Sequence, residues 1–165
     1  MRRLAVGPLI AITFSGFLLA ASTFVVPACA DPGDPREMNS SAAQRNRQVV
    51  LDFYEQFFNL HDLTAADRHI SDNYRQHNPN VPDGRQPFVA VFQKIFAQLP
   101  QRHSQIVRAV AEGDLVVLHV KLTKGTDDRG TAVVDIFRLQ AGKIVEHWDV
   151  QQPIPEKTAN ENTMF

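Results

Sequence analysis

The chain has 165 residues, with 17 basic and 18 acidic side chains and a formal net charge of −1. It contains no basic run, no interleaved aromatic and basic pattern and no nucleic-acid motif, so nucleic acid is excluded as a partner. The single cysteine, Cys29, excludes a disulfide framework, and we expect no cofactor and no metal.

Residues 1–30 have the profile of an export signal. Two arginines follow the initial methionine, no charged side chain occurs at 4–27, and the small residues at 28–30 fit an A-x-A cleavage site. We predict cleavage after Ala30 and a secreted or extracytoplasmic protein, in the periplasm or cell envelope. Two alternatives remain open, a lipid anchor on Cys29 or an uncleaved membrane span, and these are the only membrane contacts that we expect.

Residues 31–43 combine Pro, Gly, Ser and charge without apolar periodicity, which predicts a flexible leader before the domain. At 43–60, apolar residues recur at spacings of three and four, which predicts an amphipathic helix with a buried aromatic face. The residues of this face are Val50, Phe53, Tyr54, Phe57 and Phe58.

A second, shorter helix is predicted at 62–70, with Asp62 as its N-cap. The prolines and asparagines of 74–84 exclude a long regular element and predict a loop. A third helix with an aromatic face is predicted at 85–99, where Pro100 stops it.

The apolar period then changes to two, which predicts four strands joined by short turns. Helices followed by an antiparallel meander indicate an α+β domain whose helices cover one face of a curved sheet. We place this domain at 44–155, followed by a tail at 156–165 that frays or folds back. The predicted strands are 103–111, 115–123, 131–139 and 143–150.

Several polar residues stand on these strands where apolar ones are expected. By alternation His147 shares a face with Asp149, Asp135 has apolar neighbours on its own face, and His119 lies on the strand before. If these faces point under the helices, two carboxylates and two imidazoles share one cavity. A buried carboxylate is suited to acid/base catalysis, so these four residues are the catalytic candidates. The alternative is that they face solvent.

The loop after the second helix supplies candidates for substrate binding. Tyr74, Gln76, His77 and Asn78 either line the mouth of a pocket or stabilise the turn, while Asp83-Gly84 is explained by turn chemistry alone. Phe137, one of eleven phenylalanines, is a candidate for the apolar wall of such a pocket. A zinc site of His77, His119, His147 and a carboxylate is a weaker alternative, because no two ligands stand at a diagnostic spacing.

The segments YRQHNPNVPDG and DIFRLQAGKIVEHWDVQQPIPE together resemble the SnoaL-like polyketide cyclases of the NTF2-like, ketosteroid-isomerase-like superfamily. The resemblance covers about residues 44–155. It implies a cone-shaped α+β barrel, commonly dimeric, with the active centre inside. It also implies that Asp149, in the H-x-D of the last strand, is the general acid/base of an aldol ring closure. The cyclases have a histidine where this chain has Asp135.

Two classes of function are therefore expected: a lyase or isomerase acting on an apolar carbonyl compound, or a protein that binds such a compound without turnover. Pairing of Asp149 with Arg138 or Lys121 would favour the second class. We also expect a homodimer through the outer sheet face, which otherwise exposes an apolar patch. The residues assigned to that patch are Val134, Ile136, Ile144 and Trp148.

Overall fold

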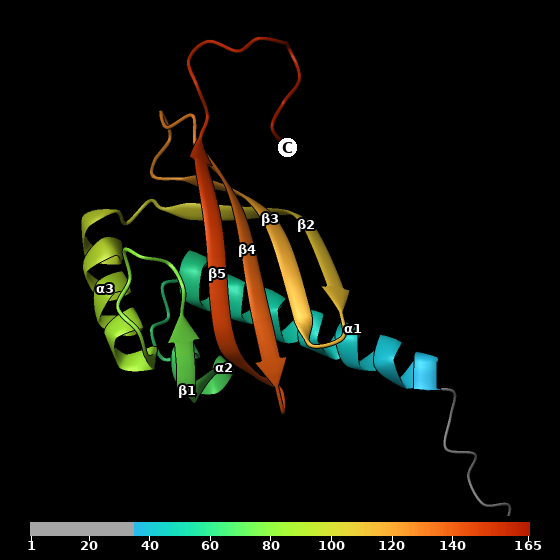
Figure 1. Cartoon of the computed structure of the whole chain (residues 1–165). Coiled ribbons are helices and arrows are strands. Elements are labelled where there is room, and N and C mark those ends of the chain that lie inside the picture. The colour runs from blue at the N-terminus through green and yellow to red at the C-terminus, as the bar shows by residue number, and fades with distance from the viewer. Residues whose placement is uncertain (1–34) are drawn as a thin grey trace, which may run out of the picture. The chain divides into compact units, whose positions relative to one another are not determined.

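In the computed structural model, which describes residues 35–165, helices pack against one face of a five-stranded sheet (Figure 1). The expected α+β class is confirmed, and the open sheet is consistent with the cone-shaped fold. Its strand order is β1-β5-β4-β3-β2. The predicted export signal lies outside the described residues. The strands are β1 (Ile70–Gln76), β2 (His103–Glu112), β3 (Leu115–Thr123), β4 (Thr131–Gln140) and β5 (Lys143–Pro153).

The first helix, α1 (Pro35–Phe53), crosses behind the sheet and continues into a single wide turn, the π-helix η1 (Tyr54–Asn59) (Figure 1). The prediction of a flexible leader is therefore wrong from Pro35 onward, because that part of the chain is helical. The predicted aromatic face is confirmed: Val50, Phe53, Tyr54, Phe57 and Phe58 are all buried.

The second helix, α2 (Ala65–His69), begins after the turn that Asp62 stabilises by accepting hydrogen bonds from Thr64. Asp62 is therefore not the N-cap. The chain then forms β1, although the sequence predicts the end of a helix and a loop there. Because β1 pairs in parallel with β5, the sheet is mixed and not wholly antiparallel. The pairing comes from a distant segment, so the polar sequence ISDNYRQ shows no local sign of a strand.

The third helix, α3 (Arg85–Gln98), agrees with its prediction and contributes more aromatic rings to the core. Its Phe88 stacks on Phe57 with ring centroids 5.0 Å apart, and its Phe92 meets Phe58 edge-on at 5.1 Å. These aromatic pairs join α3 to η1, and the cavity described below lies between them and the sheet.

The four predicted strands are confirmed as β2 to β5, with small differences at their ends. One irregularity changes which residues face the core. Leu139 pairs with Ile144, but the preceding Arg138 pairs with Glu146, so Val145 is an extra residue in β5. Simple alternation placed Ile144 on the outer face. The bulge instead puts it on the inner face, where it is fully buried.

The end of the chain turns back beyond β5 (Figure 1). The ring of Phe165 stacks on His119, with centroids 5.4 Å apart. The tail therefore folds back onto the outer face of the sheet, and not over an opening of the domain as one of the two expectations had it. Among the described residues, no helix is both long and apolar enough to cross a membrane.

Candidate functional site

A cavity of about 320 Å³ lies between α3, η1 and the inner face of the sheet. Aromatic and aliphatic side chains line the cavity on the side of α3, and polar side chains reach it from the sheet, from η1 and from the loops next to them. Such a volume and lining suit a small organic molecule. The polar lining residues are Tyr54, Gln76, Asn78, Asn80, Arg102, Lys124, Asp135, His147, Asp149 and Gln151.

Asp135 and His147 form a buried pair at this cavity. His147 Nε2 lies 2.8 Å from Asp135 Oδ1, and the two residues are only 4% and 6% exposed. Antiparallel pairing brings them together, because Asp135 lies opposite Asp149 and Phe137 lies opposite His147. The solvent-facing alternative is therefore wrong for both residues of the pair.

Gln76 sets the protonation of the His147 ring. The backbone N–H of Asn78 donates to Gln76 Oε1 (2.9 Å), which identifies that atom as the acceptor of the amide. His147 Nδ1 lies 3.2 Å from the same oxygen and therefore carries a hydrogen. The other ring nitrogen shares its proton with Asp135. The Gln76 amide donates to the Tyr74 hydroxyl at 2.8 Å, which holds it in place.

Tyr54 donates from its hydroxyl to Asp135 Oδ2 at 2.8 Å, so both oxygens of this carboxyl group have partners. Burial, followed by the charge of Asp135, raises the pKa of Tyr54 well above its ordinary value, which keeps the hydroxyl protonated. The sequence did not reveal this role, because Tyr54 falls on the aromatic face of a helix and carries no signal beyond core packing.

Asp149 lies at the side of the cavity formed by β5 and the loop, and it is partly exposed. Its Oδ2 accepts hydrogen bonds from the amides of Asn78 (2.8 Å) and Gln151 (2.6 Å). Arg138, whose pairing with Asp149 would have favoured a binding protein, contacts Glu146 and Asp114 instead. The Oδ1 atom of Asp149 has no hydrogen bond within residues 35–165.

His119 does not belong to the site. It pairs across the strands with Val134, so it points to the outer face, while its neighbours Leu118 and Val120 are buried beneath the helices. There its Nδ1 lies 3.0 Å from Arg108 Nη1. The expectation of two imidazoles in one cavity is wrong because strand alternation places His119 on the opposite face from Asp135.

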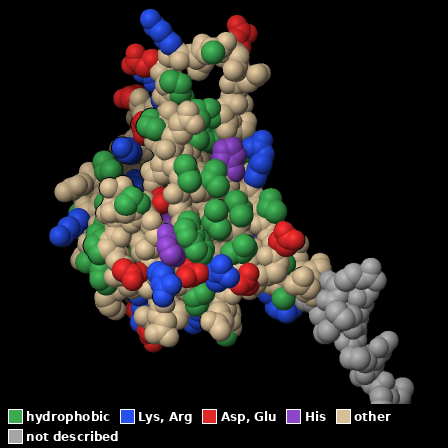
Figure 2. Space-filling view, in the orientation of Figure 1, with side chains coloured by type: hydrophobic (Ala, Val, Ile, Leu, Met, Phe, Trp, Pro, Cys, Tyr) green, Lys and Arg blue, Asp and Glu red, His purple; other side chains and the backbone are tan. Residues whose placement is uncertain are grey.

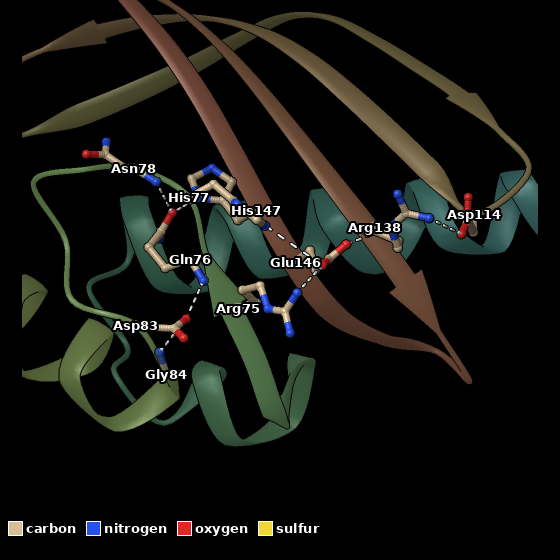
Figure 3. A network of polar contacts seen from close by, with 10 residues as sticks. All are labelled: Arg75, Gln76, His77, Asn78, Asp83, Gly84, Asp114, Arg138, Glu146 and His147. Atoms are coloured by element: carbon tan, nitrogen blue, oxygen red, sulfur yellow. Dashed lines mark hydrogen bonds and ion pairs between the residues drawn. The ribbon is translucent and has the colours of Figure 1, made fainter.

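Three of the candidates for substrate binding do not line the cavity either. His77 stacks on Trp148 at 4.5 Å and faces Glu146, as part of the network in Figure 3. Phe137 is fully buried and stacks on His147, and Tyr74 lies behind Gln76. Gln76 and Asn78 do reach the cavity.

Asp83 has the turn role expected of it, because its Oδ1 accepts from the backbone N–H groups of Gln76 and Gly84 (Figure 3). These bonds fix the loop that carries Asn78 to the cavity. The zinc alternative has no support in the part of the chain that the structure describes, where no three His, Cys, Asp or Glu side chains form a cation site. The rings of its three histidines do not converge: His77 stacks on Trp148, His147 contacts Asp135, and His119 lies on the outer face.

Comparison with known proteins identifies the family of the chain and solved structures that share its fold. The model of the SnoaL-like domain matches residues 50–147. A candidate polyketide cyclase from Bacillus cereus ATCC 10987 superposes with a TM-score of 0.61 at 21% identity, over 70% of this chain and 80% of that one. A candidate SnoaL-like polyketide cyclase from Jannaschia sp. CCS1 gives 0.58 at 19%, over 66% and 86%.

A third similar structure is named as a hydroxylase and not as a cyclase. AclR, a candidate hydroxylase from Streptomyces galilaeus, superposes with a TM-score of 0.58 at 20% identity, over 68% of this chain and 82% of that one. No curated protein shows significant sequence similarity to this chain. At these identities the solved structures establish the fold, and the chemistry has to be argued from the cavity itself.

Proposed function

The chain belongs to the SnoaL-like domain family, and from that premise we propose that it is an acid/base lyase or isomerase of a carbonyl-containing small molecule. One observation carries the proposal. The carboxylate of Asp149 and the hydrogen-bonded pair of Asp135 and His147 meet at one cavity that also has an aromatic and aliphatic wall. An apolar wall excludes water and strengthens the electrostatic interactions of the few polar groups inside it.

Asp149 is the base in this proposal. Its Oδ1 removes a proton from the carbon next to the substrate carbonyl, while the amides of Asn78 and Gln151 hold the carboxylate in position through Oδ2. The electron pair of the broken C–H bond moves to the carbonyl oxygen, which becomes an enolate. Asp149 then returns the proton to the product.

The enolate oxygen needs hydrogen-bond donors or positive charge close by. We assign this part to the group formed by Tyr54, Asp135 and His147, which carries two protons at the wall of the cavity. Gln76 keeps the His147 ring in one orientation and acts as a positioning residue. In an aldol-type reaction the enolate carbon attacks a second carbonyl and the first carbonyl re-forms. Asp149 then gives the proton that it removed to the new alkoxide, so the enzyme regains its starting state.

A second candidate function is binding without turnover. One observation favours it: the polar groups at the wall largely satisfy one another. Both oxygens of Asp135, both nitrogens of His147 and one oxygen of Asp149 already have protein partners. A network of this kind fixes the shape of a binding pocket as well as it supports catalysis.

Proton exchange separates the two functions without knowledge of the natural substrate. A panel of apolar ketones is incubated with the protein in D₂O, and deuterium incorporation next to the carbonyl is followed by NMR. We expect Asp149→Asn to lower catalysed exchange by roughly 10²- to 10⁴-fold, because the amide keeps the shape but cannot accept the proton. Asp114→Asn, a change of the same kind at an exposed position beside Arg138, is the control and should exchange normally.

Full exchange in Asp149→Asn would refute the assignment of the base. If the protein binds ketones of the panel but exchanges none of them, the binding function replaces the catalytic one.

Export remains part of the proposal for the protein as a whole. It rests on the sequence of residues 1–30, with its two arginines, its uncharged apolar stretch and its small residues at 28–30. N-terminal sequencing of the protein from its native host should begin at Asp31. An intact N-terminus, or a lipid-modified Cys29 as the first residue, would contradict cleavage after Ala30.

A further inference from the structure

Arg102 places a guanidinium group in the wall of the cavity, where the family resemblance assigned no function. It stands in the turn between α3 and β2, and its backbone N–H donates to Leu99. The guanidinium carbon lies 5.3 Å from the centre of the Phe58 ring and 5.7 Å from that of Phe92. Two aromatic rings therefore hold the cation in position at the cavity.

The Nη1 atom of Arg102 is buried and has no hydrogen-bond partner among residues 35–165. The faces of the phenylalanine rings attract the positive charge, but they do not replace the oxygen acceptors that guanidinium N–H groups require. A buried donor without an acceptor is unfavourable, and native structures rarely retain one without a reason. An acceptor on a ligand would remove this cost if the guanidinium group, whose Nη1 is closed off in this structure, turned toward the cavity.

The carboxylates of the cavity do not supply that acceptor. Asp135 uses both oxygens for Tyr54 and His147, and Asp149 stands on β5, three strands away from β2 in the sheet order. Burial lowers the pKa of Arg102, whereas the nearby Tyr54 and Asp135 raise it, and neither residue forms a hydrogen bond with its side chain. Lys124 also lines the cavity and adds positive charge to its wall.

We propose that the ligand of this cavity carries a carboxylate group that Arg102 binds. A planar carboxylate matches the planar guanidinium and accepts its N–H groups in pairs. The negative charge of Asp149 disfavours an anion on the β5 side of the cavity. The ligand should therefore bind with its carboxylate at Arg102 and its opposite end next to Asp149. The substrate of the proposed function would then be a carbonyl compound that also carries a carboxylate. The carbonyl group rests on the proposed function, whereas the carboxylate rests on Arg102 alone.

A matched pair of probes tests this inference: 4-oxo-4-phenylbutanoate and its methyl ester, which share the ketone and the ring but differ in charge. Binding of both to the full chain is measured by calorimetry at pH 7 and low ionic strength. We expect the acid to bind about 10- to 100-fold more tightly than the ester, as typical for a hydrogen-bonded charged pair.

Substitutions of Arg102 test whether this residue causes the preference for the acid over the ester. Arg102→Met keeps the length of the side chain and should remove the preference for the acid, while the ester binds within about twofold of its original affinity. Arg102→Lys keeps the charge without the planar fork and should retain part of the preference. Arg108→Met, the same change at an exposed arginine of β2 beside His119, is the control and should leave both affinities unchanged.

The inference fails if the unmodified protein does not bind the acid, if it binds acid and ester equally, or if Arg102→Met still prefers the acid. Ester binding shows that the pocket of each variant is folded. Failure of the proposed function gives a different pattern: Asp149→Asn would then exchange protons normally while the preference that depends on Arg102 persists.

Discussion

The two faces of the sheet carry polar side-chain pairs of the same length in different surroundings. On the inner face His147 and Asp135 lie 2.8 Å apart with side chains 8% and 6% exposed; on the outer face Arg138 and Glu146 lie 2.8 Å apart with side chains 43% and 22% exposed. Both pairs connect β4 to β5. The comparison shows that contact distance alone does not set the energetic weight of a polar pair, because solvent weakens the outer pair and not the inner one.

Truncation of each pair gives the largest expected difference. Asp135→Ala leaves His147 and the Tyr54 hydroxyl buried without their acceptor, and we expect it to lower the free energy of unfolding by about 3–5 kcal/mol. The matched change on the outer face, Glu146→Ala, should cost at most about 1 kcal/mol, because water reaches Arg138. Urea unfolding at pH 7 measures both values. Equal losses would show that burial does not distinguish the two faces.

Removal of the Tyr54 hydroxyl on the inner face tests how the stability of this face depends on pH. Tyr54→Phe should cost about 1–3 kcal/mol at pH 7, because Asp135 loses a buried donor. Burial and the charge of Asp135 raise the pKa of Tyr54 above its ordinary value of 10.0, so the folded state keeps a proton that the unfolded chain releases. The stabilisation is therefore complete below pH 10 and is lost as the pH rises above it.

The Tyr54→Phe variant should consequently lose stability less steeply than the unmodified protein above pH 10, as measured by urea midpoints at successive pH values. Tyr74, whose pKa burial also raises, remains in the variant and preserves part of the slope. An unchanged slope would contradict the ionisation of Tyr54 as a source of alkaline instability.

The last test concerns the apolar side chains on the outer face of the sheet. Figure 2 shows apolar side chains gathered on the face of the molecule turned toward the viewer, and Val134 and Val150 are 38% and 71% exposed. We propose a homodimer through this face. Trp148→Glu should give monomers and also removes the stacking on His77, whereas Leu60→Glu, at an exposed residue away from the sheet, should leave the dimer intact.

Sedimentation of each variant at micromolar concentration measures this association. The idea is wrong if the unmodified protein is already monomeric there. Ile144, which simple alternation assigned to this face, is buried in the core and takes no part in the test.

Local sequence patterns predicted most of the fold. The aromatic faces at 43–60 and 85–99 and the alternation of four strands follow from periods of 3.6 and two, which burial of one face imposes on any chain. The polar strand β1 has no such period, because its strand conformation depends on pairing with β5. The start of α1 at Pro35 was hidden for a similar reason: the residues from there to Ala42 carry too few apolar side chains to mark a face.

The candidate site was predictable only in part. Asp135, His147 and Asp149 were named because polar residues are rare on buried strands. Gln76 and Asn78, both predicted in a loop, lie beside them as expected, although Gln76 ends strand β1. Tyr54 and Arg102 were missed, since an aromatic residue on a helix and a lone arginine in a turn have no distinctive pattern. Tyr54 matters because its hydroxyl binds Asp135, and Arg102 because its Nη1 atom has no hydrogen-bond partner among the described residues.

By itself, the sequence determined the succession of helices and strands and the presence of polar side chains on strands that should be buried. It did not determine which face of each strand is the inner one, because a period of two is the same from either side. The tertiary structure decided that. Strand pairing aligned Asp135 with Asp149, placed His119 on the opposite face, and used the bulge at Val145 to turn both Ile144 and His147 inward.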